Sequence, residues 1–255
     1  TEDPGGDVAL DDIVITDPDT GDTVTTTLTL NNTAAVSLTT GTFGATTSSY
    51  DAVTGVWTAS GTVADVNAAL AAVAFQPATN FDQDATIATS IDDDANTGPA
   101  DGTITLDVTP ANDAPVFSGL DGTPSFTEDG TPVILDGDVT IADVELDALN
   151  SGNGNYAGAS VAIVRNGGAD PHDTFSIQTG GTLTVAGSDI SSGGNVIASF
   201  DTGTAGQVTV TFTDANGTIP TTALVDEVMQ TIRYSNASDD PSANVQLDWT
   251  FDDGG

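Results

Sequence analysis

The segment TPANDAPVF, residues 109–117, decides how the chain is organised. Pro110 and Pro115 have no backbone N–H to donate, and each disfavours helical backbone in the residue before it. We therefore expect an extended connector here rather than a helix or a paired strand. The residues on either side, 1–111 and 112–255, are each numerous enough for one domain with its own hydrophobic core.

The sequence on the two sides of this connector repeats in the same order. Thr1-Glu2-Asp3 recurs as Thr127-Glu128-Asp129, and both copies continue into an alternation of apolar residues that ends in acidic ones. Later, VNAAL at 66–70 is matched by VDEVM at 225–229, and IDD at 91–93 is matched by FDD at 251–253. Matches that keep the same order along the chain indicate an internal duplication.

Most segments alternate apolar and polar residues with a period of two and are rich in Thr, Val and Ile. Residues 23–30, 102–108 and 207–212 show this pattern, which predicts antiparallel strands. Gly and Asn clusters at 150–154 and 191–195 predict turns. We expect one short helix in each half, at 64–73 and at 223–232, the second capped by Thr221 or Thr222. The prediction is an all-β chain of two tandem β-sandwiches, each with one short helix.

The two halves differ at their ends. The first half has a last strand at 103–108, whereas the second reaches Gly255 before an equivalent strand. We expect the first half to lack part of its first strand and the second half to lack its last strand. A sheet edge left unpaired in this way is open to strand addition.

The charge of the chain is strongly one-sided. Two basic residues stand against 38 acidic ones, which gives a formal net charge of −36, and 34 of the acidic residues are Asp and 4 are Glu. Nucleic acids and anionic membranes are therefore poor partners. Asp is the short, turn-compatible carboxylate that calcium loops use, so its excess favours calcium ligation. Solvation in high salt is the alternative explanation of the acidity.

Catalytic side chains are scarce. The single histidine, His172, lies in a turn-like loop, cysteine is absent, and no nucleophile, phosphate-loop or zinc pattern occurs. We expect no enzyme activity. Trp57, Trp249, Tyr50 and Tyr156 are candidates for stacking on sugars, although aromatic residues in strands more often belong to a core. No apolar run approaches 18 residues and no basic-then-apolar leader opens the chain, so we expect no membrane insertion.

Together, these motifs resemble the bacterial cadherin-like tandem repeats of large secreted adhesins of the RTX type. The connector NDAP at 112–115 is similar to the family's linker, DPDTGD at 17–22 to its D-x-D-x-G segment, and FTEDG at 126–130 to the end of its first strand. PATNFDQD at 77–84, followed by IDD at 91–93, is similar to the lead-in to its strand F and the closing aspartate. The resemblance implies Greek-key sandwiches of the cadherin and immunoglobulin type over residues 1–111 and 112–255, with Ca²⁺ bound where repeats meet.

The resemblance also implies which residues bind the metal. Calcium takes six to eight oxygen ligands, which can come from several segments of the chain. At the internal junction we expect Glu2, Asn112, Asp113, Asp143, Glu145, and Asp252 or Asp253. At the far end of the first repeat we expect Asp17, Asp19, and Asp92 or Asp93, and Glu128 would face a following repeat.

The function that this reading implies is a calcium-rigidified structural or adhesive segment of a large extracellular bacterial surface protein, secreted or attached to the cell, of the kind found in biofilms. Its partners would be neighbouring repeats of the same protein. Two alternatives stay open at this point. One is an exopolysaccharide-binding module that recognises surface glycans. The other is a subunit of an extracellular filament or surface layer that is completed by strand exchange.

Overall fold

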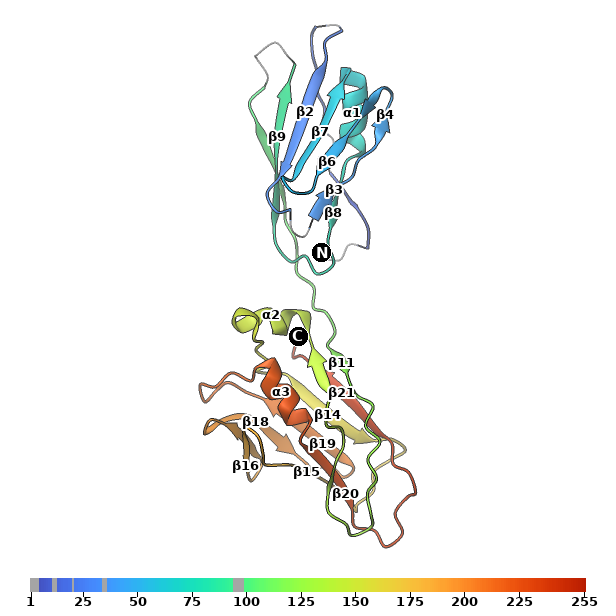
Figure 1. Ribbon diagram of the computed structural model, residues 1–255, viewed down its shortest axis with the longest axis vertical. Coiled ribbons are helices and arrows are strands. Elements are labelled where there is room, and N and C mark those ends of the chain that lie inside the picture. The colour runs from blue at the N-terminus through green and yellow to red at the C-terminus, as the bar shows by residue number, and fades with distance from the viewer. Residues whose placement is uncertain (1–4, 11–12, 20, 34–35, 94–98) are drawn as a thin grey trace. The chain divides into compact units, whose positions relative to one another are not determined.

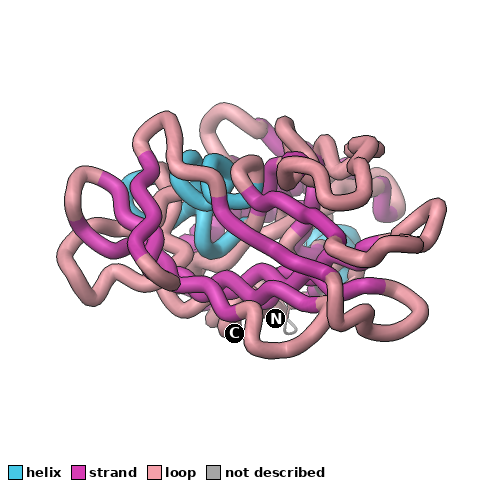
Figure 2. The backbone as a smooth tube through the Cα atoms, turned by 90° about the horizontal axis from the view of Figure 1, so that it is seen from below, coloured by secondary structure: helices cyan, strands magenta, loops and turns pink. Residues whose placement is uncertain are grey.

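The structure is a computed structural model that describes residues 5–10, 13–19, 21–33, 36–93 and 99–255. Contacts between residues divide the chain into two compact units, Thr1–Ala111 (unit 1) and Asn112–Gly255 (unit 2) (Figure 1). The division falls at the boundary expected from the connector. Strands make up most of the regular structure (Figure 2), and the all-β prediction is confirmed.

Unit 1 contains a five-stranded sheet in the order β10-β9-β2-β7-β6, a three-stranded sheet β1-β8-β3 and a small hairpin β4-β5. Its elements are β1 (Val8–Ala9), β2 (Val24–Leu30), β3 (Val36–Leu38), β4 (Thr42–Phe43), β5 (Thr46–Thr47), β6 (Ser49–Asp51), β7 (Val56–Gly61), α1 (Val63–Ala72), β8 (Ala74–Pro77), β9 (Ala85–Asp92) and β10 (Gly102–Leu106). One hydrophobic core takes side chains from both larger sheets.

Unit 2 contains a six-stranded sheet β16-β17-β18-β19-β14-β21, a three-stranded sheet β12-β20-β15 and the pair β11-β13. Its elements are β11 (Val116–Ser118), β12 (Val133–Ile134), β13 (Thr140–Ala142), α2 (Val144–Gly152), β14 (Ser160–Arg165), β15 (Asp173–Ile177), β16 (Leu183–Ala186), β17 (Asp189–Ser192), β18 (Asn195–Asp201), β19 (Gln207–Phe212), α3 (Thr222–Met229), β20 (Ile232–Asn236) and β21 (Leu247–Asp252). Residues 107–115 contain no helix or strand.

Burial along the central strands explains why the alternating segments form sheet. In β2, Val24, Thr26, Leu28 and Leu30 are buried, and the residues between them are half-exposed. Successive side chains of a strand point to opposite faces, so this pattern places one face of β2 on the core. Leu28 pairs across the sheet with Trp57, whose ring is fully buried and donates its Nε1–H to the carbonyl of Thr39 at 2.9 Å.

The two units pair their strands in the same order. The central strand β2 lies between β7 and β9, and β14 lies between β19 and β21. The strand after the helix, β8 in unit 1 and β20 in unit 2, is the middle strand of each three-stranded sheet. Unit 1 also has β10 on the outer edge of β9. No described strand of unit 2 occupies the corresponding edge of β21.

The expectation of one helix per half is wrong for unit 2, because α2 precedes β14 in addition to α3. Asp143 is the N-cap of α2, and its carboxylate accepts the N–H of Leu146 at 2.8 Å. Glu145 and Asp147 place negative charge in the first turn, where the helix dipole favours it. The helix is regular only in its first part, since Asn150 and Ser151 have φ of 53° and 60°. The predicted turn at 150–154 therefore overlaps its end.

The other two helices lie within a few residues of their expected positions. Helix α1 begins after its N-cap Thr62, whose side chain accepts the N–H of Asp65. Helix α3 has Thr221 at its N-cap without a side-chain capping bond, and it ends at Met229, three residues before the expected Ile232, which begins β20. None of the helices in the described part of the chain is long and apolar enough to cross a membrane.

An ion pair inside unit 2 joins three strands. The carboxylate of Asp173 is fully buried, and Nη1 of Arg165 donates to both of its oxygens at 2.7 and 2.9 Å. The Tyr234 hydroxyl also donates to Asp173, as does Nδ2 of Asn236 at 2.8 Å. Burial, together with the bond to Asp173, raises the pKa of Tyr234 to about 12. The phenol therefore stays a hydrogen-bond donor across the physiological pH range.

Replacing Arg165 by Met should destabilise unit 2 by about 3–5 kcal/mol, because it leaves the buried Asp173 carboxylate without its cation. Native-state hydrogen exchange of β15 and β20 in urea measures the free energy of unfolding of this unit separately. Arg233→Met is the matched control, since Arg233 forms no ion pair with a described residue, and it should change the unfolding free energy by less than about 1 kcal/mol. Equal losses in the two variants would contradict the role assigned to the pair.

Candidate metal centre

Strand pairing brings most of the predicted junction residues to one end of unit 2. Strands β11 and β13 are antiparallel with Val116 opposite Ala142. Asp113 precedes β11 by three residues, and Asp143 directly follows β13, so both lie at the same end of this pair. Asp252 ends β21, and Phe251 beside it packs edge-on against Phe117 of β11, with ring centroids 6.2 Å apart.

Side-chain contacts fix the residues of the connector on this end of unit 2. Nδ2 of Asn112 donates to Oδ2 of Asp253 at 2.7 Å, and the N–H of Asp113 donates to Oε2 of Glu145 at 3.3 Å. The hydrogen bond from Asn112, with that from the Gly255 N–H, holds the pKa of Asp253 below its usual value. Four of the predicted ligands are thus in contact in pairs, within one unit.

Two carboxylate oxygens at this end accept no hydrogen bond from any residue that the structure describes. Asp143 is only 3% exposed, and while its Oδ1 accepts the Leu146 N–H, its Oδ2 is buried and accepts nothing from a described residue. Oδ2 of Asp113 is buried in the same way. A buried charged acceptor without a partner costs more than the roughly 1–3 kcal/mol of a neutral one. Such oxygens are the kind of ligand that a hard cation takes.

Asp147 holds the first turn of α2 in place and is already fully hydrogen-bonded. Its Oδ1 accepts the hydroxyls of Tyr156 at 2.8 Å and Thr222 at 2.6 Å. Its Oδ2 accepts the N–H of Asp143 at 3.1 Å. Burial, followed by the contact with Asp147, raises the pKa of Tyr156, so this hydroxyl remains a donor. The hydroxyls of Tyr156 and Thr222 are therefore directed at Asp147 and not at Oδ2 of Asp143.

The remaining predicted ligands are placed as follows. Glu2 lies outside the described residues, so its part in the junction stays a prediction. In unit 1, Oδ1 of Asp17 accepts the N–H of Asp19 at 2.8 Å, and Oδ2 of Asp17 is buried without a donor among the described residues. Asp92 ends β9 opposite Thr25, with Asp93 next to it.

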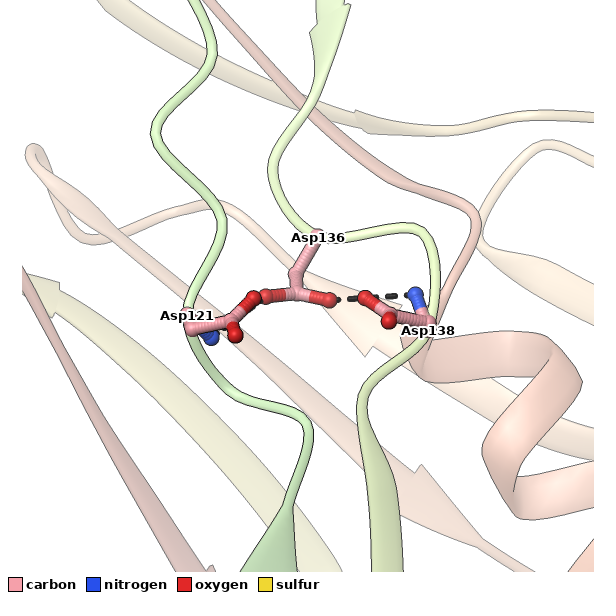
Figure 3. A group of neighbouring side chains, drawn as sticks. All are labelled: Asp121, Asp136 and Asp138. Carbon is pink, nitrogen blue, oxygen red and sulfur yellow. Dashed lines mark hydrogen bonds between the residues drawn. The ribbon is translucent and has the colours of Figure 1, made fainter.

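Groups of three carboxylates with oxygens within 4.8 Å of one another do form in the described chain, but none consists only of predicted ligands. Glu128 belongs to one of them, together with Asp129 and Asp239, and all three are exposed. The other contains Asp121, Asp136 and Asp138, which the sequence reasoning missed (Figure 3). The Asp-Gly-Asp run at 136–138 is the sequence feature that could have indicated this group.

Asp136 is buried, with 3% exposure, and both of its oxygens are fully used by backbone donors. Oδ2 accepts the N–H groups of Asp121 at 3.0 Å and Gly122 at 2.7 Å. Oδ1 accepts those of Asp138 at 3.1 Å and Val139 at 2.9 Å. Burial opposes the charged form, but these four bonds outweigh it and lower the pKa of Asp136. The group is explained as a structural anchor of two loops, and we assign no metal to it.

Gly122 is required for this anchor. A Cβ added at Gly122 would lie 2.4 Å from the carbonyl oxygen of Leu135 and 2.8 Å from Oδ2 of Asp136. Real Cβ atoms do not approach backbone oxygens this closely, so a side chain at this position would push the loop away from Asp136. The N–H of Gly122 reaches the carboxylate only because there is no side chain.

The suggestion that Trp57 and Tyr156 stack on sugars is wrong. Both rings are fully buried in the cores of their units, so neither offers a face to a ligand. Trp249 is half-buried and packs edge-on against Phe117 at 6.2 Å between ring centroids. Tyr50 is half-exposed, and its hydroxyl donates to the carbonyl of Val36 at 3.3 Å.

No protein-family model matches the chain, and no curated protein matches it in sequence.

Replacing Asp136 by Asn should destabilise unit 2 by roughly 3 kcal/mol, because the amide keeps one acceptor oxygen but turns N–H donors towards two backbone N–H groups. The folded-state pKa of Asp136 is lowered, so its stabilisation is fully present above the unfolded value of about 3.9. It is lost as the pH falls through the lower folded value. The difference between wild type and variant, measured by hydrogen exchange or urea unfolding, should therefore shrink at strongly acid pH.

Asp121→Asn is the matched control for this test, because Asp121 contributes its backbone N–H and not its carboxylate to the anchor. It should change the unfolding free energy by less than about 0.5 kcal/mol with or without calcium. If calcium stabilised the wild type and both variants abolished that effect, the three carboxylates would form a metal site and the assignment to a structural anchor would fail.

Proposed function

We propose that this chain is a calcium-rigidified structural or adhesive segment of an extracellular bacterial surface protein, built from two tandem cadherin-like repeats. The observation that supports it best is the pair of buried oxygens, one on Asp113 and one on Asp143, that accept no hydrogen bond from a described residue. They lie at the end of unit 2 that carries the connector. The sequence resemblance expects metal ligands at these positions.

The side chains at this end have the chemistry that calcium prefers. Carboxylates of Asp113, Asp143, Glu145 and Asp253 and the amide oxygen of Asn112 are hard oxygen ligands, and calcium takes six to eight of them in flexible geometry. Asn112 donates its amide N–H to Asp253. To offer its oxygen instead, the amide group has to turn over, which exchanges its donor and acceptor atoms. Calcium binding should therefore break the hydrogen bond between Asn112 and Asp253, and both side chains should then bind the ion through their oxygen atoms.

A cation bound in this way would join three segments of unit 2. The connector contributes Asn112 and Asp113, the start of α2 contributes Asp143 and Glu145, and the end of β21 contributes Asp253. Ligands on three separate segments make the connector part of the folded unit and restrict its motion. The same charge would offset part of the repulsion among the acidic side chains, which the formal charge of −36 makes large.

Halophilic solvation is the competing explanation of the acidity, and it makes a different prediction. Monovalent salt screens exposed charges over about 10 Å at 0.1 M and does so at every acidic side chain. A specific calcium site depends on a few named carboxylates and is filled at low total ion concentration. Experiments at a constant, moderate ionic strength therefore separate the two explanations.

Calcium added to the EDTA-treated chain at fixed ionic strength should give saturable heat in calorimetry and raise the melting temperature, because binding to the folded state alone stabilises it. Asp113→Asn and Asp143→Asn should each weaken the affinity roughly tenfold or more, a loss of about 1.4 kcal/mol or more. Asn at position 143 can still cap α2, so this variant removes the charge and keeps the helix start.

Glu128→Gln is the control, since it removes an exposed carboxylate from a different acidic group, and it should leave the affinity unchanged. Calcium that neither produces heat nor shifts the melting temperature of the wild type would rule out the proposed function. A response that is equal for magnesium, for sodium at matched ionic strength and for all variants would support solvation instead.

A further inference from the structure

The loop between β14 and β15 carries an aspartate–proline peptide bond inside a tight turn. The N–H of Asp173 donates to the carbonyl oxygen of Asp170 at 3.1 Å, which closes a turn with Pro171 and His172 at its two central positions. The nitrogen of Pro171 is that of a tertiary amide. Such a nitrogen is more basic than an ordinary peptide nitrogen and leaves more readily once it is protonated. Acid therefore breaks the bond before Pro171 more easily than an ordinary peptide bond.

The side chain of Asp170 is held close to its own backbone. Its Oδ1 accepts the N–H of His172 at 2.9 Å, the local bond that Asp side chains make with the backbone two residues on. Its Oδ2 lies 3.4 Å from Nη1 of Arg165 and from Nδ2 of Asn236. The bond from the His172 N–H is the main cause that lowers the pKa of Asp170, so the carboxylate stays ionised in mild acid. An ionised carboxylate at this position can close a five-membered ring on its own carbonyl carbon.

The imidazole of His172 places a proton donor next to this carboxylate. Its Nδ1 lies 3.1 Å from Oδ1 of Asp170, and the side chain is 53% exposed. Histidine is the side chain that changes charge between pH 5 and 8. The other titratable groups of this network are Arg165 on β14, Asp173 on β15 and Tyr234 on β20. The raised pKa values of Arg165 and Tyr234 keep both side chains protonated over this range.

Water and a polarising hydrogen bond are also present at the same peptide bond. A hollow of about 610 Å³ borders the turn, and Asp170, Pro171 and His172 line it. The N–H of Asp173 points at the carbonyl oxygen of Asp170, where negative charge develops when the carbonyl carbon is attacked. A nucleophile, a proton donor, a donor to the carbonyl oxygen and access for water therefore meet at this bond. An intramolecular nucleophile that is already in place gains much over one in solution.

The other aspartate–proline bonds in the described part of the chain lack parts of this arrangement. Oδ1 of Asp17 accepts the N–H of Asp19 at 2.8 Å, so the bond between residues 17 and 18 has the same local turn. Asp19 stands there in the position that His172 has in unit 2, and it offers a carboxylate in place of an imidazole. The bond between residues 240 and 241 lies in a loop, 237–243, that contains no histidine. The chain thus contains its own comparison bonds.

We propose that the chain cleaves its own peptide bond between Asp170 and Pro171 in mild acid. Oδ2 of Asp170 attacks the carbonyl carbon of the same residue, a C–O bond forms, and the C–N bond to Pro171 breaks, which leaves a five-membered cyclic anhydride on Asp170. The proline nitrogen takes a proton that His172 supplies and becomes a new amino terminus. One water then opens the anhydride to two carboxyl groups, and a proton returns to His172. The net reaction is the hydrolysis of one peptide bond.

Strand pairing should hold the two products together after cleavage. Strand β14 belongs to the first product, and its neighbours β19 and β21 belong to the second. The break is therefore detected only after denaturation. It also goes beyond the proposed function, because no step of the cleavage uses the calcium ligands at the connector.

Incubation of the purified full chain with protease inhibitors at about pH 5, where histidine carries its proton, tests the proposal. Denaturing electrophoresis and mass spectrometry should show two fragments, residues 1–170 and 171–255. Their formation should be independent of protein concentration and at least roughly tenfold slower at about pH 8. The same rates are expected in EDTA and in calcium. The bonds 17–18 and 240–241 should stay intact in the same sample.

Two variants test the assigned roles. Asp170→Asn keeps an acceptor for the His172 N–H but removes the carboxylate, and it should abolish cleavage. His172→Gln keeps the backbone turn and removes the imidazole, so it should slow cleavage at least roughly tenfold and remove its dependence on pH. Asp240→Asn is the matched control and should cleave at the wild-type rate. Circular dichroism identifies a variant that fails to fold, and the other variant then provides the test.

Three results would overturn the proposal. The first is a wild-type chain that stays intact at about pH 5, where histidine is protonated. The second is cleavage at all aspartate–proline bonds at equal rates, which would show ordinary acid hydrolysis. The third is a folded His172→Gln variant with the rate and the pH profile of the wild type.

Discussion

Buried carboxylates need hydrogen-bond donors, and this chain has few cations to supply them. The chain has two basic residues and 38 acidic ones. An ionised group that is buried without a compensating partner costs several kcal/mol of folding free energy. Unit 2 meets this need with the donors at hand. Asp173 takes an arginine, a tyrosine and an asparagine, Asp147 takes two hydroxyls and an N–H, and Asp136 takes four backbone N–H groups. Around each of these carboxylates, the chain adopts the conformation that directs the donors at the carboxylate oxygens.

The same requirement separates two kinds of acidic cluster that look alike in sequence. Around Asp136, three carboxylates come close together, yet the buried one has no free oxygen. Asp113 and Asp143 belong to no such group of three among the described residues, but each has a buried oxygen that accepts no hydrogen bond from the described part of the chain. A count of neighbouring acids would rank the first cluster higher. Counting the hydrogen-bond donors of each buried oxygen reverses this ranking of the two clusters. For this reason the proposed calcium site lies at the connector.

The fold was largely predictable from sequence because period-two alternation reports burial directly. Residues 207–212 were expected as a strand and form β19, and the expected strand at 23–30 differs from β2 by one residue. Helix α2 is not among the predicted elements, because Asp143 and Glu145 are predicted there as metal ligands, although an aspartate followed by acidic residues in the first turn is also typical of a helix start. The anchor at Asp136 could not be predicted from the sequence, because two of its donors lie 14 and 15 residues before it along the chain. Composition and local motifs do not show that these residues come together in the fold.

The close approach at Gly122 has a consequence for how this sequence can vary. Position 122 tolerates no side chain whatever residue stands at 136, because the nearest atom to an added Cβ is the backbone carbonyl oxygen of Leu135. Asp136, in turn, has a full set of donors only while residue 122 is glycine. In natural variants of this protein, aspartate at 136 should therefore occur only together with glycine at 122, whereas glycine at 122 should persist where residue 136 differs.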